Sequence, residues 1–363
     1  MKSVLILLPC TFTGVIVYVL YSSSFTNPVF VEYYYSRGVY PLLSKFSSLT
    51  ANLPFSAAEF LLYAFLVFLV LYVIFIAASF FRKKGMRLRI QSALFRTVVL
   101  FVILSSMWGS FMLGWSINYA RQPLSQSLGL DASPSSGREL YDVCRHLAVK
   151  ANDLRDRTLE DKNGVFRLTQ SKEEINREVK MVYRNNAPPF MNLGGETNIK
   201  SVASTNLLST MNTLGIYIPF TYEPNINMQM PDLYYASSAL HEYAHFKGFA
   251  REDEANFIAY YVSKDMDDTD FAYSSTMLAL CHALGQLSGH NYELYCGIYD
   301  SLSEPVKRDF ANENIYWAQF EETKETAETM NNNYLISNKQ EDGVQSYGRM
   351  VDLLIALDRS DSL

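Results

Sequence analysis

The sequence contains little cysteine and little histidine, with four and five residues among 363. Cys10 lies in a long apolar run, and Cys144, Cys281 and Cys296 cannot all pair with one another. A small fold held together by a disulfide framework is therefore excluded. Internal repeats and low-complexity tracts are also absent, so solenoid and fibrous architectures are not expected.

Charge is missing from three long stretches, at about 4–21, 57–81 and 97–117. Each is close to the roughly 20 residues that an α-helix needs to cross a bilayer. The second contains a single charge, Glu59 at its start, and the third contains none. We therefore expect three transmembrane helices within a membrane region spanning 1–119. The first stretch also has the form of a signal peptide, but no clear small-x-small cleavage site follows it, which favours an uncleaved anchor.

Acidic residues are absent from the connection between the second and third stretches. This segment, 82–96, contains six basic residues, and short basic loops remain in the cytoplasm. The third helix would then lead outward, so residues 120–363 are expected to form an extracytoplasmic domain of a multi-pass cell-membrane protein. That domain carries 35 of the 37 acidic and 22 of the 31 basic residues, a net charge of −13. This excess of negative charge argues against nucleic acid as a partner.

The domain is expected to be mainly α-helical with a small sheet. Amphipathic patterns predict a helix after Ser136, a suitable N-cap, and two helices near the C-terminus. One stretch differs, because "GIYIPFTYEPNINM" at 215–228 alternates β-branched and aromatic residues. Pro219 and Pro224 lack the N–H that a sheet ladder requires, which predicts an edge strand or a hairpin.

The most informative stretch is "PDLYYASSALHEYAHFKG", which reads as one helix starting near Pro231 and ending at Gly248. His241 and His245 are four residues apart and share one face of this helix, with Glu242 beside them. In this His-Glu-x-x-His arrangement two imidazoles bind a metal and the glutamate polarises a bound water. Nitrogen and oxygen ligands suit Zn²⁺.

The third ligand is expected from the following helix, "EDEANFIAYYVSK". Arg251 occupies the position at which an extended histidine motif would place its third histidine, so that class is excluded. Glu252 and Asn256 are four residues apart, and Glu-x-x-Ala-Asn resembles a signature of zinc peptidases that use a glutamate ligand. There the first residue binds zinc and the last supports a zinc-binding histidine. Glu254 is the competing ligand, but it lies about 200° around the helix from Glu252.

As a whole, the sequence resembles a family of bacterial three-span membrane proteins that share a domain of unknown function with gluzincin-like features. The resemblance rests on the motif region and on segments such as "VEYYYSRGVYPLLS", "LPFSAAEFLLY", "WSINYARQPL" and "GVQSYGRMVDLLIA". It implies a membrane-anchored, zincin-like metallopeptidase domain. It does not indicate a substrate or an oligomeric state.

These observations lead to two hypotheses of different classes. In the first, the chain is a zinc metallopeptidase that hydrolyses peptide or protein substrates outside the cytoplasm. Glu242 is its base, and Tyr273 is a candidate donor to the developing oxyanion, with His282 as an alternative. In the second, a non-catalytic membrane protein uses zinc only to join two helices. A closed structural site has no use for Glu242. An intramembrane protease is disfavoured, because the motif lies far beyond the last apolar stretch.

The expected topology can be tested with reporter fusions. A reporter placed after Lys84 should report a cytoplasmic position, because the basic loop stays inside, and one placed after Leu363 should report an external position. Paired alkaline phosphatase and fluorescent-protein fusions measure both. Finding the two positions on the same side would contradict the three-span arrangement.

Overall fold

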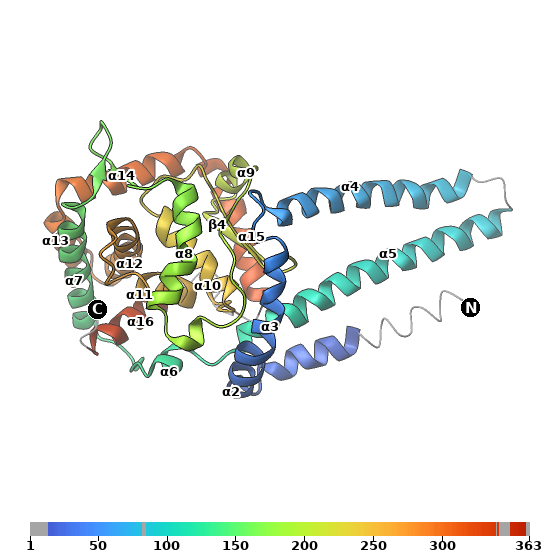
Figure 1. Ribbon diagram of the computed structural model, residues 1–363, viewed down its shortest axis with the longest axis horizontal. Helices are drawn as coiled ribbons and strands as arrows, with labels where there is room; N and C mark the ends of the chain where they lie inside the picture. The colour runs from blue at the N-terminus through green and yellow to red at the C-terminus, as the bar shows by residue number, and fades with distance from the viewer. Residues whose placement is uncertain (1–13, 82–84, 339, 341–348, 361–363) are drawn as a thin grey trace.

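The computed structural model describes residues 14–81, 85–338, 340 and 349–360. The described chain is mostly helical, with long apolar helices projecting from one side of a helical domain (Figure 1). The N-terminal elements are a helix at Gly14–Ser24, α2 (Pro28–Phe30), η1 (Val31–Val39), α3 (Tyr40–Ser44), η2 (Lys45–Leu49), α4 (Ala57–Ala77), η3 (Ala78–Phe81), α5 (Met86–Gly114) and η4 (Ser116–Ala120).

The domain is built from short strands and helices of mixed length. Its helices are α6 (Leu124–Leu128), α7 (Gly137–Arg155), α8 (Lys172–Asn186), η5 (Pro189–Met191), α9 (Thr205–Thr210), α10 (Tyr235–Phe246), α11 (Glu252–Tyr261), α12 (Thr269–His290), α13 (Tyr292–Ser301), α14 (Glu304–Ala318), α15 (Glu321–Ser337) and α16 (Arg349–Asp358). Its strands are β1 (Leu159–Glu160), β2 (Phe166–Arg167), β3 (Lys200–Ser201), β4 (Gly215–Ile218) and β5 (Glu223–Ile226).

Two helices are long and apolar enough to cross a membrane. Ala57–Phe81 combines α4 with η3, and Met86–Ala120 combines α5 with η4. A third candidate is bent by 103° between Gly14–Ser24 and Pro28–Leu49, so the described chain contains two or three candidate spans. The stretch predicted at 4–21 lies partly outside the described residues. The helix predicted at 97–117 begins earlier, at Met86, because the residues from Met86 to Arg96 are also helical.

Local sequence signals explain several boundaries in the domain. Ser136 caps α7 through a reciprocal capping box with Glu139, as its position before an amphipathic run predicts. Helix α10 begins at Tyr235 rather than near Pro231. The reason is that the carboxylate of Asp232 accepts the backbone N–H of Leu168, at 3.2 Å, and pairs with Lys172 instead of capping the helix.

The sheet of three strands has the order β3-β5-β4, so β4 lies at an edge. Strands β4 and β5 form the predicted hairpin, and β3 pairs with β5 in parallel. The prolines predicted an edge strand or a hairpin, and the hairpin is found, although Pro224 lies in the central strand. It is tolerated there because β3 pairs only with Asn225 and Ile226, so no N–H is required of Pro224 on that side.

One hydrophobic core extends through the domain and into the segments next to the apolar helices. It surrounds α10, α11 and α12, and it includes Tyr40, Trp115 and Tyr119 from the region before residue 120. Helix α10 is buried along nearly its whole length, which explains why apolar residues occur on all of its faces.

Gly248 ends α10 in the left-handed conformation, with φ of +85°. A Cβ at this position would lie 2.8 Å from the Tyr40 ring. Gly248→Ala should therefore destabilise the protein by about 1–3 kcal/mol, through backbone strain and overpacking.

The matched control is Gly285→Ala. Gly285 lies within α12, and a Cβ added there would have open space around it, with nothing within 4 Å. Alanine should therefore stabilise the protein by about 0.5–1 kcal/mol. Thermal unfolding of the purified protein in detergent measures both. Equal melting temperatures for the two variants would contradict this account of Gly248.

Candidate metal centre

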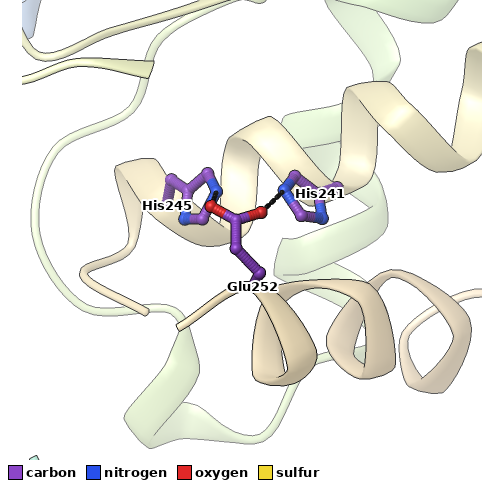
Figure 2. A group of neighbouring side chains, drawn as sticks. All are labelled: His241, His245 and Glu252. Carbon is purple, nitrogen blue, oxygen red and sulfur yellow. Dashed lines mark ion pairs between the residues drawn. The ribbon is translucent and has the colours of Figure 1, made fainter. Parts of the chain in front are cut away.

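Helix α10 presents two histidine side chains on one buried face. The rings of His241 and His245 lie with centroids 4.6 Å apart and planes at 88°. The turn after Gly248 then reverses the chain, and α11 packs against α10. This reversal brings Glu252, the first residue of α11, to the two imidazoles (Figure 2).

The carboxylate of Glu252 lies between the two rings. Its Oε2 is 3.2 Å from His241 Nε2, and its Oε1 is 3.5 Å from His245 Nε2. One ligand atom from each residue lies within 4.8 Å of the others. Two ligands at about 2.0–2.1 Å from a tetrahedral zinc are separated by roughly 3.4 Å, so the distances to Glu252 fit such an ion.

The outer nitrogens of both histidines already have acceptors. His241 Nδ1 is 2.7 Å from Asn256 Oδ1, and His245 Nδ1 is 2.7 Å from the carbonyl oxygen of Phe249. A carbonyl oxygen only accepts, so each Nδ1 carries the hydrogen and each Nε2 keeps its lone pair for a metal. Such outer partners fix the orientation and tautomer of metal-binding histidines. The set of two imidazoles and one carboxylate therefore fits zinc.

The charges in this group are strongly coupled. Burial alone would raise the pKa of Glu252, but His245 and His241 outweigh that effect and lower it. Burial likewise opposes the charged form of His245, yet Glu252 above all, together with Glu242 and the Phe249 carbonyl, raises its pKa to about 9. The carboxylate thus provides the negative charge that either a proton or a metal ion on these imidazoles requires.

Glu242 lies beside the group formed by His241, His245 and Glu252, which we call the triad, but it is not one of the three. Its side chain is 4% exposed, and no hydrogen-bond partner for Oε2 is found among the described residues. Burial raises the pKa of this carboxyl group to about 7, although the two histidines oppose the rise. Strand β4 closes over it, because a Cβ on Gly215 would lie 2.5 Å from Glu242 Cγ. Only glycine permits this approach of strand and carboxyl group.

Glu254, the alternative third ligand, points elsewhere. Its Oε1 accepts the backbone N–H of Leu124 at 2.8 Å and a hydrogen bond from Arg251 at 2.7 Å. The carboxylate therefore stabilises the start of α6. Of the two candidate acids, the structure brings only Glu252 to the histidines.

Tyr273 is fully buried in α12, and its hydroxyl donates to Asp309 at 2.7 Å. The same carboxylate accepts from Arg155 and from the backbone N–H of Phe166, so Tyr273 belongs to a buried polar network between α7, α12 and α14. No described contact joins it to the triad. For His282, the alternative donor, burial and secondarily the charge of His241 lower the pKa to about 4.

Sequence reasoning missed the aromatic residues that surround the site. Trp115 packs edge-on against His245, with ring centroids 6.0 Å apart, and contacts Tyr217 at 4.7 Å. Tyr40 places its hydroxyl 2.8 Å from that of Tyr217. Tyr334 accepts a hydrogen bond from Tyr119, at 3.2 Å. Burial, with a contribution from the charge of Glu252, raises the pKa of Tyr334. Trp115 lies at the end of the third apolar stretch, and Tyr40 and Tyr334 lie far from the motif in the sequence, so no local signal indicated that they meet there.

A family match covers the span helices and the metal centre together. Residues 35–355 match the family described as "Protein of unknown function (DUF3810)". The chain belongs to the DUF3810 family. Its matched region begins before Tyr40 and contains α4, α5 and the His241–His245–Glu252 group, so the DUF3810 region includes both the apolar helices and the site. No curated protein and no solved structure matches the chain.

The arrangement predicts which residues bind zinc. Purified protein equilibrated with zinc should contain about one ion per chain, and His241→Ala or His245→Ala should remove it. Glu252→Gln should weaken zinc binding by more than about 100-fold, and Asn256→Ala by about 10- to 100-fold, because Asn256 only orients His241.

Glu254→Gln is the matched control, since Glu254 contacts Arg251 and Leu124 instead. Metal content by elemental analysis and competition with a chelating dye measure all five variants. If Glu254→Gln lost more zinc than Glu252→Gln, the assignment of the third ligand would be incorrect.

Proposed function

We propose that this chain is a membrane-anchored zinc metallopeptidase with a zincin-like domain that acts outside the cytoplasm. The observation that carries the proposal is the convergence of His241, His245 and Glu252 beside Glu242, a buried carboxyl group with an unpartnered oxygen. When bound, zinc would act as a Lewis acid that activates water and polarises a carbonyl group.

Glu242 is suited to proton transfer. A general base works best when its pKa is close to the working pH, and burial brings that of Glu242 to about 7. Its unpartnered oxygen lies beside the triad, so it can accept a proton from water there and return it to the leaving amine. The hydroxyl of Tyr273 donates to Asp309, so we assign the role of hydroxyl donor to Tyr334 instead, whose oxygen accepts a hydrogen bond from Tyr119.

The free edge of strand β4 is evidence for a peptide substrate in particular. In the hairpin with β5, the carbonyl of Leu214 accepts the N–H of Asn227, and Pro224, which has no N–H, lies opposite Tyr217. Backbone groups alternate in direction along an antiparallel strand, so those of Gly215 and Tyr217 point toward the free edge. An extended peptide can pair there by β-augmentation, next to Glu242.

The alternative, a structural zinc site, has less support. A closed structural site requires four protein ligands. Among the described residues the ligand group contains three, His241, His245 and Glu252, which leaves one position for water or substrate. The remaining partners that we propose are the bilayer and a polypeptide. Nucleic acid is disfavoured by the acidic balance of residues 120–363.

The decisive substitution is Glu242→Gln. It should leave zinc content and melting temperature essentially unchanged, because glutamine is nearly isosteric. It should reduce cleavage of unfolded polypeptide by about 10²- to 10⁴-fold, because the proton acceptor is lost. Mass spectrometry of peptide-library digests measures the activity.

Glu196→Gln is the control, since Glu196 lies on the surface and pairs with Arg184. It should cleave at the rate of the unmodified protein. A protein that contains zinc but cleaves no library member, or a Glu242→Gln variant that cleaves normally, would favour the structural-zinc alternative.

A further inference from the structure

The metal centre lies directly at the end of a candidate membrane span. Trp115 follows α5 immediately, and its ring contacts both His245 and Tyr217. The apolar helices project away from this side of the domain, whereas α10 lies just behind it (Figure 1). No linker separates the span from the residues that pack on the site.

A second element lies at the same boundary between the apolar helices and the domain. Residues Pro28–Leu49, which we call the crosswise segment, run at 103° to the helix Gly14–Ser24 and across the inner ends of α4 and α5 (Figure 1). The side chains that this segment buries include Glu32, Ser36, Ser44 and Ser47. Its exposed side chains are largely apolar: Val29, Phe30, Tyr33, Tyr34, Val39, Leu42, Phe46 and Leu49.

The buried face also contains Val31 and Tyr40. An exposed face that is largely apolar, over a buried face with four polar side chains, is nevertheless the inverse of the pattern in water. It fits a segment that lies in the interfacial layer of the bilayer. Tyr40 from this segment places its hydroxyl near the carbonyl oxygens of His245 and Phe246, at 3.4 and 3.3 Å. The surface that faces lipid and the end of the metal-binding helix are therefore separated by one tyrosine side chain.

The β4–β5 hairpin connects the site to this boundary. Gly215, at one end of β4, lies against Glu242, while the turn at the other end rests on the last turns of α5. Phe220 in the turn packs against Phe111, with ring centroids 6.3 Å apart, and is 53% exposed. The start of α4 is fixed to the same hairpin, because the N–H of Ala58 donates to Glu223 at 2.6 Å.

The direction of β4 defines the path of a paired peptide. Its four residues cover roughly 10 Å at about 3.3 Å per residue, from Glu242 toward the bilayer surface. A strand added at the free edge would follow the same line. A polypeptide that enters the site along β4 would thus come from the membrane, a few residues after leaving it.

We infer that the substrate is a membrane-anchored polypeptide, cut in an extended segment within about three to eight residues of the bilayer surface. This inference rests on the proposed peptidase function and specifies its substrate. The position of the cut is set by distance from the membrane, because α5 leads directly into Trp115 and the start of α4 is bonded to the hairpin through Ala58 and Glu223. These two connections hold the metal centre at a fixed distance from the bilayer. The amino-acid sequence of the substrate around the cut has less influence on where the cut is made.

The test uses the full chain, loaded with zinc, in proteoliposomes together with a substrate that has one transmembrane helix. The helix is followed by an unstructured reporter sequence, and Gly-Ser spacers of 0 to 25 residues are inserted between the two. Cut positions are read by mass spectrometry. We expect the cut to remain within about three to eight residues of the helix for every spacer length, so that it moves through the sequence as the spacer grows.

Two controls separate the possible outcomes. The same reporter without its helix should be cut at least about tenfold more slowly, because it lacks the local concentration that the membrane provides. Glu242→Gln should abolish both reactions. If the soluble reporter is cut as fast as the tethered one, or if the cut follows the reporter sequence at every spacer length, the inference is overturned while the peptidase function stands. If neither reporter is cut and peptide libraries are also inert, the proposed function fails.

Discussion

Two imidazoles and two carboxyl groups lie in the interior of the domain, and the requirement to give these polar groups partners organises the fold around them. Buried polar groups without partners are costly, and buried charges without counterions more so. Glu252 balances the histidines, Asn256 and the Phe249 carbonyl hold their outer nitrogens, and Glu242 retains one oxygen without a partner among the described residues. The one incompletely satisfied group of these four is also the one to which we assign proton transfer in the proposed function.

The contact between the crosswise segment and the domain is secured in the same way. Glu32 pairs with Arg121 through two hydrogen bonds of 2.7 and 2.8 Å, and both side chains are nearly completely buried. Arg121 also donates to the carbonyl oxygen of Gly248, at the end of α10. Glu32 also pairs with Arg37, at 2.7 Å. Removing Glu32 would leave Arg121 buried without its counterion, a cost of about 3–5 kcal/mol. The crosswise segment is therefore part of the structure that supports α10, the helix that carries His241 and His245.

The sequence predicted the local features well. Helical spacing placed His241, His245 and Glu242 together, and the 200° separation on α11 indicated that Glu252 and Glu254 would not both face the histidines. Ser136 and Gly248 marked helix ends through well-understood capping chemistry. The apolar stretch at 57–81 matches the helix Ala57–Phe81, because a long run without charge leaves few alternatives.

What the sequence could not show depends on contacts between distant segments. Trp115, Tyr40 and Tyr334 come from three regions of the chain, and nothing in their neighbourhoods indicates that they meet near His245 and Glu252. Tyr273 was a reasonable candidate until Asp309 was found to accept its hydroxyl. The place of Pro224 in the central strand could not be predicted for a similar reason, because its tolerance there depends on where β3 ends.

Because Trp115 follows α5 without a linker, the direction in which its ring points depends on the number of residues in α5. One residue added or removed within α5 would turn everything beyond it by about 100° and displace it by about 1.5 Å along the axis. Trp115 would then no longer face His245, and the hairpin would lose its place against Phe111. A membrane helix usually tolerates changes in length by tilting. Here the rotation of a candidate span about its axis is tied to the orientation of the His245 ring. The length of α5 is therefore constrained by the geometry of the candidate metal centre as well as by the thickness of a bilayer that it would cross.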